Sequence, residues 1–328
     1  MAIGLVMAYH GGVPVPGDLG VTCFFVLSGF LITWLLLKEH AKHGRISLRD
    51  FYLRRVLRII PAYAAYVLIT ALYTRWRTGE GWDPLLTLSA VTYTTNYYNA
   101  AHGHAPTPIS HTWSLAVEEQ FYMLWPLALL ALMRLPRKRA VRALIGAIAA
   151  VLVWRSVAFY VLGTGTAYVY NCFETRFDCL AVGCLLALVT QQSNCDVLAR
   201  RLVRFDWLPL VTVTLIVFSR TCSEAYHYGP GFTVDSLLFA VLIVQLLQLV
   251  RKPSWSWLEA PAVRWVGLLS YSLYLYHGLG IGLGRKLGSL PAGVQLGLGI
   301  VASFALALAS YHGIEKPFLR LKKRFERR

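Results

Sequence analysis

The chain has 328 residues, of which 56% are hydrophobic and only 15% charged, whereas about a quarter of the residues in an average soluble domain are charged. This composition excludes a disordered or collagen-like chain and argues against a soluble globular enzyme. The formal net charge is +16 at pH 7. Such a charge can mark a nucleic-acid-binding protein, but here the basic residues stand between long apolar runs, which indicates a protein that crosses a membrane several times.

Ten apolar runs are candidates for membrane spans, because a helix needs roughly 20 apolar residues to cross a bilayer core of about 30 Å. In chain order they are 2–9, 19–37, 56–73, 120–133, 141–162, 177–192, 207–219, 234–250, 265–284 and 287–314. We predict an all-α fold, a polytopic transmembrane helical bundle of about ten spans, with residues 1–328 forming a single integral membrane domain. The first run ends nine residues into the chain, so we expect the first span to be truncated at the N-terminus.

The distribution of Lys and Arg predicts the orientation of these spans, since basic residues mark cytoplasmic loops. With the N-terminus inside, the segments 38–58, 134–142, 200–204, 251–264 and 316–328 face the cytoplasm and carry most of the basic residues. The outer loops carry only Arg75, Arg77, Arg176, Arg220, Arg285 and Lys286. We therefore predict a multi-pass cell-membrane protein with both termini cytoplasmic, whose basic charge attracts anionic membrane lipid rather than nucleic acid.

The first candidate for chemistry is His10, at the outer end of the first run and just before a turn rich in Gly and Pro. Ionisable groups at membrane depth are costly and often functional. A histidine can accept a proton near neutral pH, which suits a general base. The alternative is an interfacial histidine that caps a helix.

Arg55 and Arg58 form the second candidate, because residues three apart share one face of a helix. Two guanidinium groups at a cytoplasmic helix entrance can bind a pyrophosphate or a 3′-phosphate through paired hydrogen bonds. The alternative is plain anchoring by cytoplasmic arginines, which explains both residues without any ligand.

The third candidate is the segment 111–122, where Glu118 and Glu119 stand just ahead of a span on the predicted outer side. Either carboxylate can orient a histidine or bind a sugar hydroxyl, and Ser114 can cap the helix or lie beside Glu118, four residues on. The alternatives are stabilisation of a helix dipole by acids in its first turn and an ordinary aromatic belt that includes Trp113 and Tyr122.

His277 follows three tyrosines inside a long span. It can line a polar cavity or form a helix–helix hydrogen bond. Gly280 and Gly284 on the same run have the small-xxx-small spacing of packed membrane helices. Arg155 also lies within a span, and we expect it to pair with an acid that the sequence does not identify.

Several enzyme signatures are absent from the sequence. It contains no GxxxxGK[ST], HExxH or GxSxG motif, which argues against an ATP-driven pump, a zinc protease and a serine hydrolase of the usual type. No cysteine–histidine spacing typical of a metal site occurs, so we predict no metal. Cys172 and Cys222 fall on predicted outer loops, and a disulfide between them is left open.

Five blocks of the sequence, in this order, resemble the acyltransferase 3 family of integral membrane O-acyltransferases. They are residues 20–32 after His10, residues 54–63 with the RxxR element, residues 113–122, residues 270–277 and residues 315–318. The resemblance covers essentially the whole chain. It implies transfer of an acyl group, often acetyl from acyl-CoA, to a hydroxyl of a carbohydrate or glycosylated acceptor. Acyl-CoA would be a co-substrate, with no permanently bound cofactor.

The resemblance also implies roles for individual residues. His10 matches the essential histidine of the family, and Arg55 and Arg58 match its RxxR element, where the acyl donor is thought to dock. Glu118 and Glu119 match the acids of the third block. We therefore predict His10, Glu118 and Glu119 as catalytic and Arg55 and Arg58 as donor-binding. The predicted substrate-binding residues are Trp113, Ser114, Tyr122 and His277. Direct transfer by His10 as a base and an acyl-histidine intermediate are both open.

The sequence departs from the family pattern at two places. Thr22 stands where the family often has Asp, and the basic residue that the family carries eleven residues before its histidine would precede Met1. Because of these departures, one alternative is that the chain is an inactive relative that acts as a membrane scaffold. A transporter or flippase of lipid-linked sugars is another, because many spans with buried charges suit it equally well. The outer segment 75–111, rich in Tyr, Asn and His, suits either a carbohydrate or the membrane interface.

Overall fold

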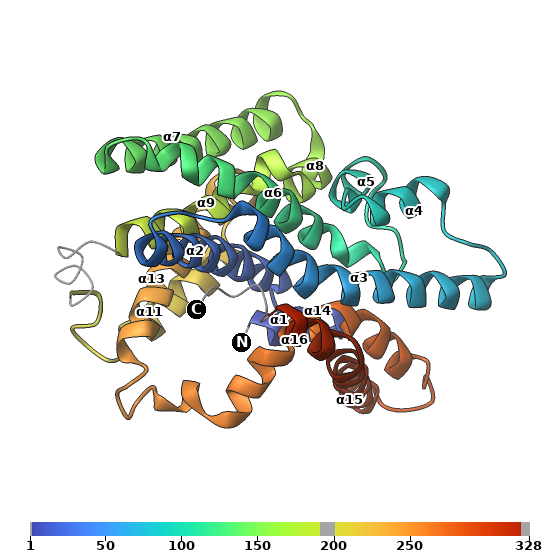
Figure 1. Cartoon of the computed structure of the whole chain (residues 1–328). Coiled ribbons are helices and arrows are strands. Elements are labelled where there is room, and N and C mark those ends of the chain that lie inside the picture. The colour runs from blue at the N-terminus through green and yellow to red at the C-terminus, as the bar shows by residue number, and fades with distance from the viewer. Residues whose placement is uncertain (1, 191–200, 323–328) are drawn as a thin grey trace.

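The computed structural model describes residues 2–190 and 201–322 (Figure 1), and within them the chain is helical with connecting turns and no strand. The last two residues of the predicted run 177–192 and the basic residues beyond 322 lie outside this part. The N-terminal half contains α1 (Ala2–His10), α2 (Gly17–His43), α3 (Leu48–Thr78), α4 (Pro84–Val91), α5 (Thr95–His102), η1 (Ser110–Thr112), α6 (Trp113–Met133), α7 (Arg137–Ser156) and η2 (Val157–Val161). The C-terminal half contains α8 (Gly165–Asn171), α9 (Phe173–Thr190), α11 (Leu208–Phe218), η3 (Ser219–Thr221), α12 (Glu224–Tyr226), η4 (His227–Gly231), α13 (Phe232–Leu249), η5 (Ser256–Glu259), α14 (Pro261–Arg285), α15 (Ala292–Ser310), η6 (Tyr311–Glu315) and α16 (Lys316–Lys322).

The all-α prediction is confirmed, and six of the predicted spans are helices long and apolar enough to cross a membrane. These six are Gly17–His43, Leu48–Thr78, Ser110–Met133, Arg137–Val161, Glu224–Leu249 and Ala292–Lys322. The other four predicted runs fall on α1, α9, α11 and α14. Helix α9 carries three ionisable residues within 18, and α1 has only nine residues, so neither is a span by length and composition alone.

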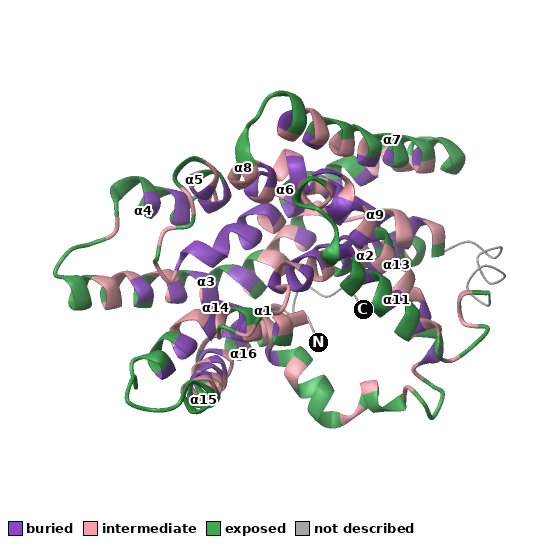
Figure 2. Ribbon diagram, turned by 180° about the vertical axis from the view of Figure 1, so that it is seen from behind, coloured by how far each residue is buried: buried purple, intermediate pink, exposed green. Residues whose placement is uncertain are grey.

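Helices from distant parts of the sequence pack around α2 and α6. In Figure 1, α2, α6 and α9 lie in the middle of the molecule, α7 covers one side, and α14 to α16 lie on the other. Helix α2 contacts α1, α6, α9 and α13, while α14 packs along α15. Buried residues lie along the inner faces of these helices, whereas much of α7 is exposed (Figure 2).

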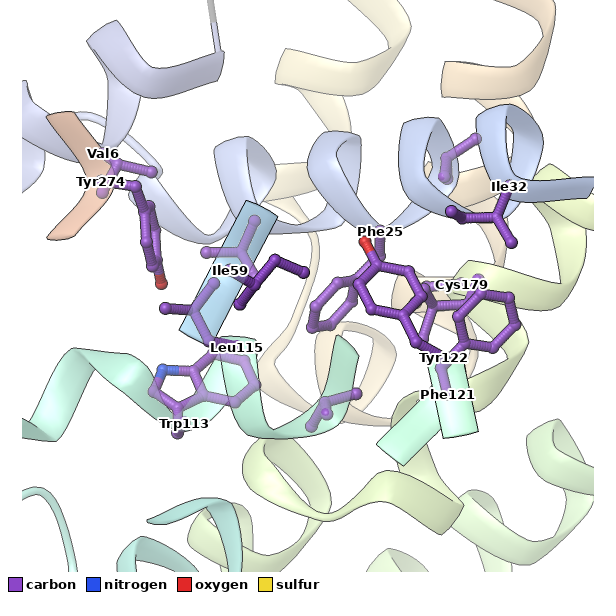
Figure 3. Packing of buried hydrophobic residues seen from close by; sticks show 14 of the residues in the cluster. Val6, Phe25, Ile32, Ile59, Trp113, Leu115, Phe121, Tyr122, Cys179 and Tyr274 are labelled. Carbon is purple, nitrogen blue, oxygen red and sulfur yellow. The ribbon is translucent and has the colours of Figure 1, made fainter. Parts of the chain in front are cut away.

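The core brings aromatic residues of α6 against α2 (Figure 3). Phe25 of α2 meets the ring of Trp113 edge-on, with 6.2 Å between ring centroids. Phe121 stacks on Trp125 one turn further along α6, at 5.6 Å. All four rings are at least nine-tenths buried. Large rings at helical spacing therefore form the contact that fixes α6, and with it the polar residues at both of its ends, against α2.

Glycines allow α2 and α9 to pack closely against each other. A Cβ placed on Gly29 of α2 would overlap the carbonyl oxygen of Leu180, and one on Gly183 of α9 would overlap that of Val26. The two backbones therefore touch at a crossing that no larger residue permits. The predicted packing role of Gly280 and Gly284 is confirmed in the same way, since both face the backbone of α15.

Helix α3 connects the two ends of the bundle. Its N-terminus is capped by Ser47, whose hydroxyl accepts from the backbone N–H of Asp50, and its C-terminus by Gly79 in the left-handed conformation (φ 77°). Arg55 lies near the first end of this helix and Arg77 near the second. At 1.5 Å per residue these two positions are about 33 Å apart along the axis, close to the thickness of a bilayer core.

A buried ion pair ties three helices together and confirms that Arg155 pairs with an acid. Its guanidinium donates to both carboxylate oxygens of Asp178 at 2.9 Å, and neither side chain is exposed. The remaining donors reach Thr233 at 2.5 Å and the carbonyl of Gly229 at 2.8 Å. Every polar atom of the guanidinium thus has a partner on a helix other than its own, and α7, α9 and α13 are held in one arrangement.

Candidate functional site

Two histidines from opposite ends of the chain form a hydrogen-bonded pair. His10 ends α1, and its Nδ1 lies 2.9 Å from the carbonyl of Val6 and 3.3 Å from Nε2 of His277 on α14. Nδ1 of His277 lies 2.7 Å from the carbonyl of Tyr274. A carbonyl only accepts, so these contacts assign the proton to Nδ1 of each neutral ring. Nε2 of His10 is then left without a proton and can accept one.

A third histidine and a tyrosine extend this pair. The rings of His111 and His277 have their centroids 4.8 Å apart, the same as His10 and His277. The hydroxyl of Tyr274 donates to the carbonyl of His111 at 2.9 Å, so the 2.5 Å contact with Ser114 places Ser114 as the donor to that tyrosine oxygen. Among the described residues, no group of three or more His, Cys, Asp or Glu side chains is arranged to hold a metal ion.

A cavity of about 1240 Å³ is lined by two of these three histidines, His10 and His111, but not by the fully buried His277. This volume exceeds the usual range of about 300–1,000 Å³ for small-molecule sites, so there is room for more than one sugar ring. Its walls come from the ends of α1, α3 and α14, the start of α2, the segment between α5 and α6, α8 and η4. They include His10, Trp113, His111, Tyr170, Asn171 and His227. The structure thus places the predicted residues His10 and Trp113 on the wall of one cavity.

The acids of α6 lie away from this cavity, beside the arginines of α3. Ser28 of α2 donates to Glu118 at 2.6 Å and contacts the hydroxyl of Tyr122 at 3.1 Å. The guanidinium of Arg55 lies over the ring of Tyr122, 5.2 Å from its centroid, and interacts electrostatically with Glu118 and Glu119. No hydrogen bond or ion pair joins either glutamate to His10 within the described chain. The structure thus brings Glu118, Glu119 and Tyr122 to Arg55 instead.

Polar residues of α14 and η6 surround the other arginine of the RxxR element. Glu315 is buried and accepts a hydrogen bond from Ser272 of α14, and it interacts electrostatically with Arg58. Tyr271 donates to the carbonyl of Ile59 at 3.0 Å, which joins α14 to α3. Glu315 belongs to the last of the five sequence blocks. No role was predicted for it, because a lone Glu at the end of an apolar run carries no signal beyond a helix terminus.

Taken along the bundle, the predicted site residues form two groups joined by α6 and α14. Arg55, Arg58 and the glutamates lie at one end of α3, and the histidines and the cavity lie toward the other. Ser114 of α6 and Tyr274 of α14, which are hydrogen-bonded to each other, belong to the histidine group. Cys172 and Cys222 are both free thiols, so they do not form the disulfide that the sequence left open.

An isolated arginine lies behind the aromatic wall of the cavity. Arg176 of α9 is fully buried, and its guanidinium lies 3.7 Å from the ring centroid of Phe232. Its one hydrogen bond to a side chain goes to Thr22 at 3.2 Å, while Nε and Nη1 have no partner in the protein. A buried cation with no carboxylate in hydrogen-bond contact is costly, and the side chain that bonds Arg176 is Thr22, the position at which the resemblance to the family implies an Asp.

We expect the substitution Thr22→Asp to stabilise the protein. The new carboxylate would lie within reach of Arg176 and supply a charge-assisted hydrogen bond worth about 1.5–3 kcal/mol. Thermal unfolding in detergent should then show a midpoint raised by a few degrees. Thr22→Asn is the matched control, since it has the same shape without the charge. A midpoint raised equally by both variants, or lowered by Thr22→Asp, would contradict the assignment.

The sequence is similar to bacterial proteins that are named as O-acetyltransferases. "Peptidoglycan O-acetyltransferase OatA" of Listeria monocytogenes is 30% identical, over 97% of this chain and 54% of its own length. "Putative peptidoglycan O-acetyltransferase YrhL" of Bacillus subtilis is 32% identical, over 92% of this chain and 50% of its own. The chain therefore spans about half the length of these relatives. No solved structure gives a significant match.

The family comparison covers nearly the whole chain. The sequence model of the acyltransferase 3 family, described as an acyltransferase domain, matches residues 1–312. This range includes the first four sequence blocks and ends before the fifth, residues 315–318. It also contains both groups of site residues and all six candidate spans apart from the end of the last. The chain therefore belongs to the acyltransferase 3 family of multi-pass membrane proteins.

Proposed function

We propose that this chain transfers an acyl group, acetyl in the simplest case, from acyl-CoA to a hydroxyl of a carbohydrate. The observation that carries the proposal is the His10–His277 pair, which leaves one unprotonated imidazole nitrogen of His10 at the wall of a large cavity. The names of the relatives, which are peptidoglycan O-acetyltransferases, support an acetyl donor and a glycan acceptor.

The proposed topology has ten spans with both termini in the cytoplasm. The basic residues of segments 38–58 and 134–142 support this orientation, because cytoplasmic loops carry the excess of Lys and Arg. It places Arg55 and Arg58 on the cytoplasmic side and the cavity of His10 on the outer side. A cytoplasmic donor would then modify an acceptor outside the cell.

The proposed reaction is a direct transfer with His10 as general base. Nε2 of His10 takes the proton of the acceptor hydroxyl, and the oxygen attacks the carbonyl carbon of the thioester. The carbon–sulfur bond breaks, and the imidazolium returns its proton to the departing thiolate of CoA. His277 positions His10, because the hydrogen bond to Nδ1 holds the ring and keeps its proton on the nitrogen away from the acceptor.

The donor phosphates are proposed to bind at Arg55 and Arg58. Arg58 is exposed, and Arg55 is partly buried against Tyr122 and Phe51. A guanidinium held over aromatic rings loses less freedom when it binds a phosphate, and paired N–H groups match phosphate oxygens. The nearby Glu118 and Glu119 would orient Arg55, so their predicted catalytic role becomes a positioning role at the donor end.

We expect Arg55→Gln/Arg58→Gln to weaken acyl-CoA binding about tenfold or more, since each charge-assisted hydrogen bond contributes about 1.5–3 kcal/mol. The measurement is calorimetric titration of acetyl-CoA into the full chain in nanodiscs. Arg49→Gln is the matched control, because Arg49 lies on the same helix and is exposed. If Arg49→Gln weakened binding equally, the arginines would act only as cytoplasmic anchors.

The same preparation separates this proposal from the transporter alternative. A transferase releases CoA only while acceptor is consumed, whereas a transporter of lipid-linked sugars moves its solute with no acyl-CoA present. Movement of a lipid-linked sugar across the bilayer without acyl-CoA would therefore contradict the proposed function.

A further inference from the structure

The cavity in front of His10 carries an unusual concentration of positive charge. Three of the six basic residues on the predicted outer side line it: Arg77 at the end of α3, and Arg285 and Lys286 at the end of α14. All three are exposed, and none forms an ion pair within residues 2–190 and 201–322. Outer loops of membrane proteins are normally poor in such residues, so their position at the cavity needs a separate explanation.

Local contacts hold two of these cations in place. The guanidinium of Arg285 donates to the carbonyl of His10 at 2.6 Å, so this charge lies directly beside the proposed base. The ammonium of Lys286 lies 5.0 Å from the ring centroid of Tyr73, in a cation–π contact. Tyr73 comes from α3, one turn before Arg77. The three charges therefore belong to one patch, made where the ends of α3 and α14 meet.

The acid of the cavity does not neutralise this patch. Asp18 lines the cavity but is bound 2.6 Å from Arg220, which also pairs with the buried Asp235. Asp18 is therefore held by Arg220 of η3 and forms no ion pair with Arg77, Arg285 or Lys286 among the described residues. A cavity with one sign of uncompensated charge focuses its field on a ligand of the opposite sign.

A second part of the cavity wall carries polar atoms that the protein leaves without a partner. Nε2 of His111, Oγ of Ser110 and Oγ1 of Thr107 are buried, belong to cavity-lining residues and form no hydrogen bond in the protein, and Asn171 of α8 lines the same cavity. His111 is nine-tenths buried and Asn171 fully so. Buried polar groups normally have partners. Hydroxyl and amide groups of a sugar supply both donors and acceptors for such a wall.

From these two walls we propose an acceptor subsite for an acidic saccharide, with its sugar ring on the wall of Thr107, Ser110, His111 and Asn171 and its anionic group on Arg77, Arg285 and Lys286. This subsite rests on the proposed function and narrows the acceptor to a saccharide that bears a carboxylate or a phosphate. The anionic group next to Arg285 would place a hydroxyl of the same or the neighbouring ring near Nε2 of His10.

The test compares saccharides that differ in one anionic substituent, by ligand-observed NMR with the full chain in nanodiscs and no acyl donor present. The probes are N,N′-diacetylchitobiose beside the N-acetylglucosamine–N-acetylmuramic acid disaccharide, which adds a lactyl carboxylate, and N-acetylglucosamine beside its 6-phosphate. We expect the charged member of at least one pair to bind about tenfold tighter in low salt and to lose that advantage in high salt. The pair that shows the difference identifies carboxylate or phosphate.

The variants Arg77→Gln and Lys286→Gln should each reduce binding of the charged probe several-fold and leave the neutral probe unchanged. Arg75→Gln is the matched control, since Arg75 lies on the same turn of α3 but does not line the cavity. Equal binding of charged and neutral probes, binding of none of them, or an equal loss in Arg75→Gln would overturn the proposal. The binding test uses no acyl donor, so its result does not depend on acyl transfer. If the charged probe bound more tightly but the chain never released CoA in the transfer assay, the subsite would stand and only the proposed function would be contradicted.

Discussion

Replacing His10 with Ala should reduce acyl transfer by about 100- to 10,000-fold, the usual contribution of a positioned general base. The expected loss follows from the geometry at the end of α1. The Nδ1 proton of His10 is directed at Val6 and His277, and Nε2 is the nitrogen left to take a proton from the acceptor. Alanine removes this nitrogen and the contact with His277, but it leaves the packing of α1 on α2 and the hydrogen bond from Arg285 to the backbone carbonyl of residue 10 in place. Radiolabelled acetyl transferred from acetyl-CoA to cell-envelope glycan is the measurement.

A control variant and a second readout show whether the loss concerns the chemistry. His40→Ala changes an exposed histidine at the far end of α2 and should leave transfer unchanged. His10→Ala should also keep the unfolding midpoint and the acetyl-CoA affinity of the wild type, since His10 does not touch Arg55 or Arg58. Wild-type transfer by His10→Ala would exclude the proposed mechanism.

Asp178→Asn should destabilise the fold by about 3–5 kcal/mol, the typical cost of leaving one member of a buried ion pair uncompensated. The carboxylate of Asp178 accepts two bonds from Arg155 and a further one from Thr233. An amide keeps one acceptor oxygen but turns an N–H group toward a guanidinium that can only donate, so the network loses one of its two acceptor oxygens as well as its charge. We expect a much lower midpoint of thermal unfolding in detergent, or no folded protein in the membrane.

Two further variants distinguish the buried pair from ion pairs in general. Asp206→Asn breaks an exposed pair with Lys252 and should leave the midpoint unchanged. Arg155→Met/Asp178→Leu removes both charges and should recover part of the stability, because apolar residues of similar size can replace a buried pair at little cost. A double variant as unstable as Asp178→Asn would show that packing rather than the unpaired charge causes the loss.

The sequence predicted the helices well because long apolar runs and loop charges are local signals. All ten predicted runs fall on helices, and Arg155, which lies inside a predicted run, was expected to have an acid partner. The partner itself was out of reach, since Asp178 and Asp235 are both acids within spans and only the packing of α7 on α9 decides between them. The number of spans does not follow from composition alone either. Helix α9 carries three charged residues within 18, which lowers its hydropathy, yet most of its side chains are buried in the fold.

For the site, the sequence indicated candidate residues, but it did not indicate which of these residues contact each other. His10 and His277 are 267 residues apart and belong to separate blocks, so nothing local indicates that they touch. Glu118 was expected near the outer histidine because it begins a span. In the structure, Ser28 and Arg55 hold it instead, because the turn of α6 from Ser114 to Glu118 carries it toward the other end of the bundle. The sequence indicated Arg77, Arg285 and Lys286 only as separate basic residues on the outer side. Their position at one cavity follows from the packing of α3 against α14, which the sequence does not show.

The most direct test of the account is the stoichiometry of CoA release by the full chain in nanodiscs with acetyl-CoA and cell-envelope glycans. The account predicts that release depends on glycan, that one acetyl group appears on glycan for each CoA released, and that His10→Ala abolishes both. CoA release that continues at the same rate without glycan, or with His10→Ala, would contradict transfer to a carbohydrate by this histidine.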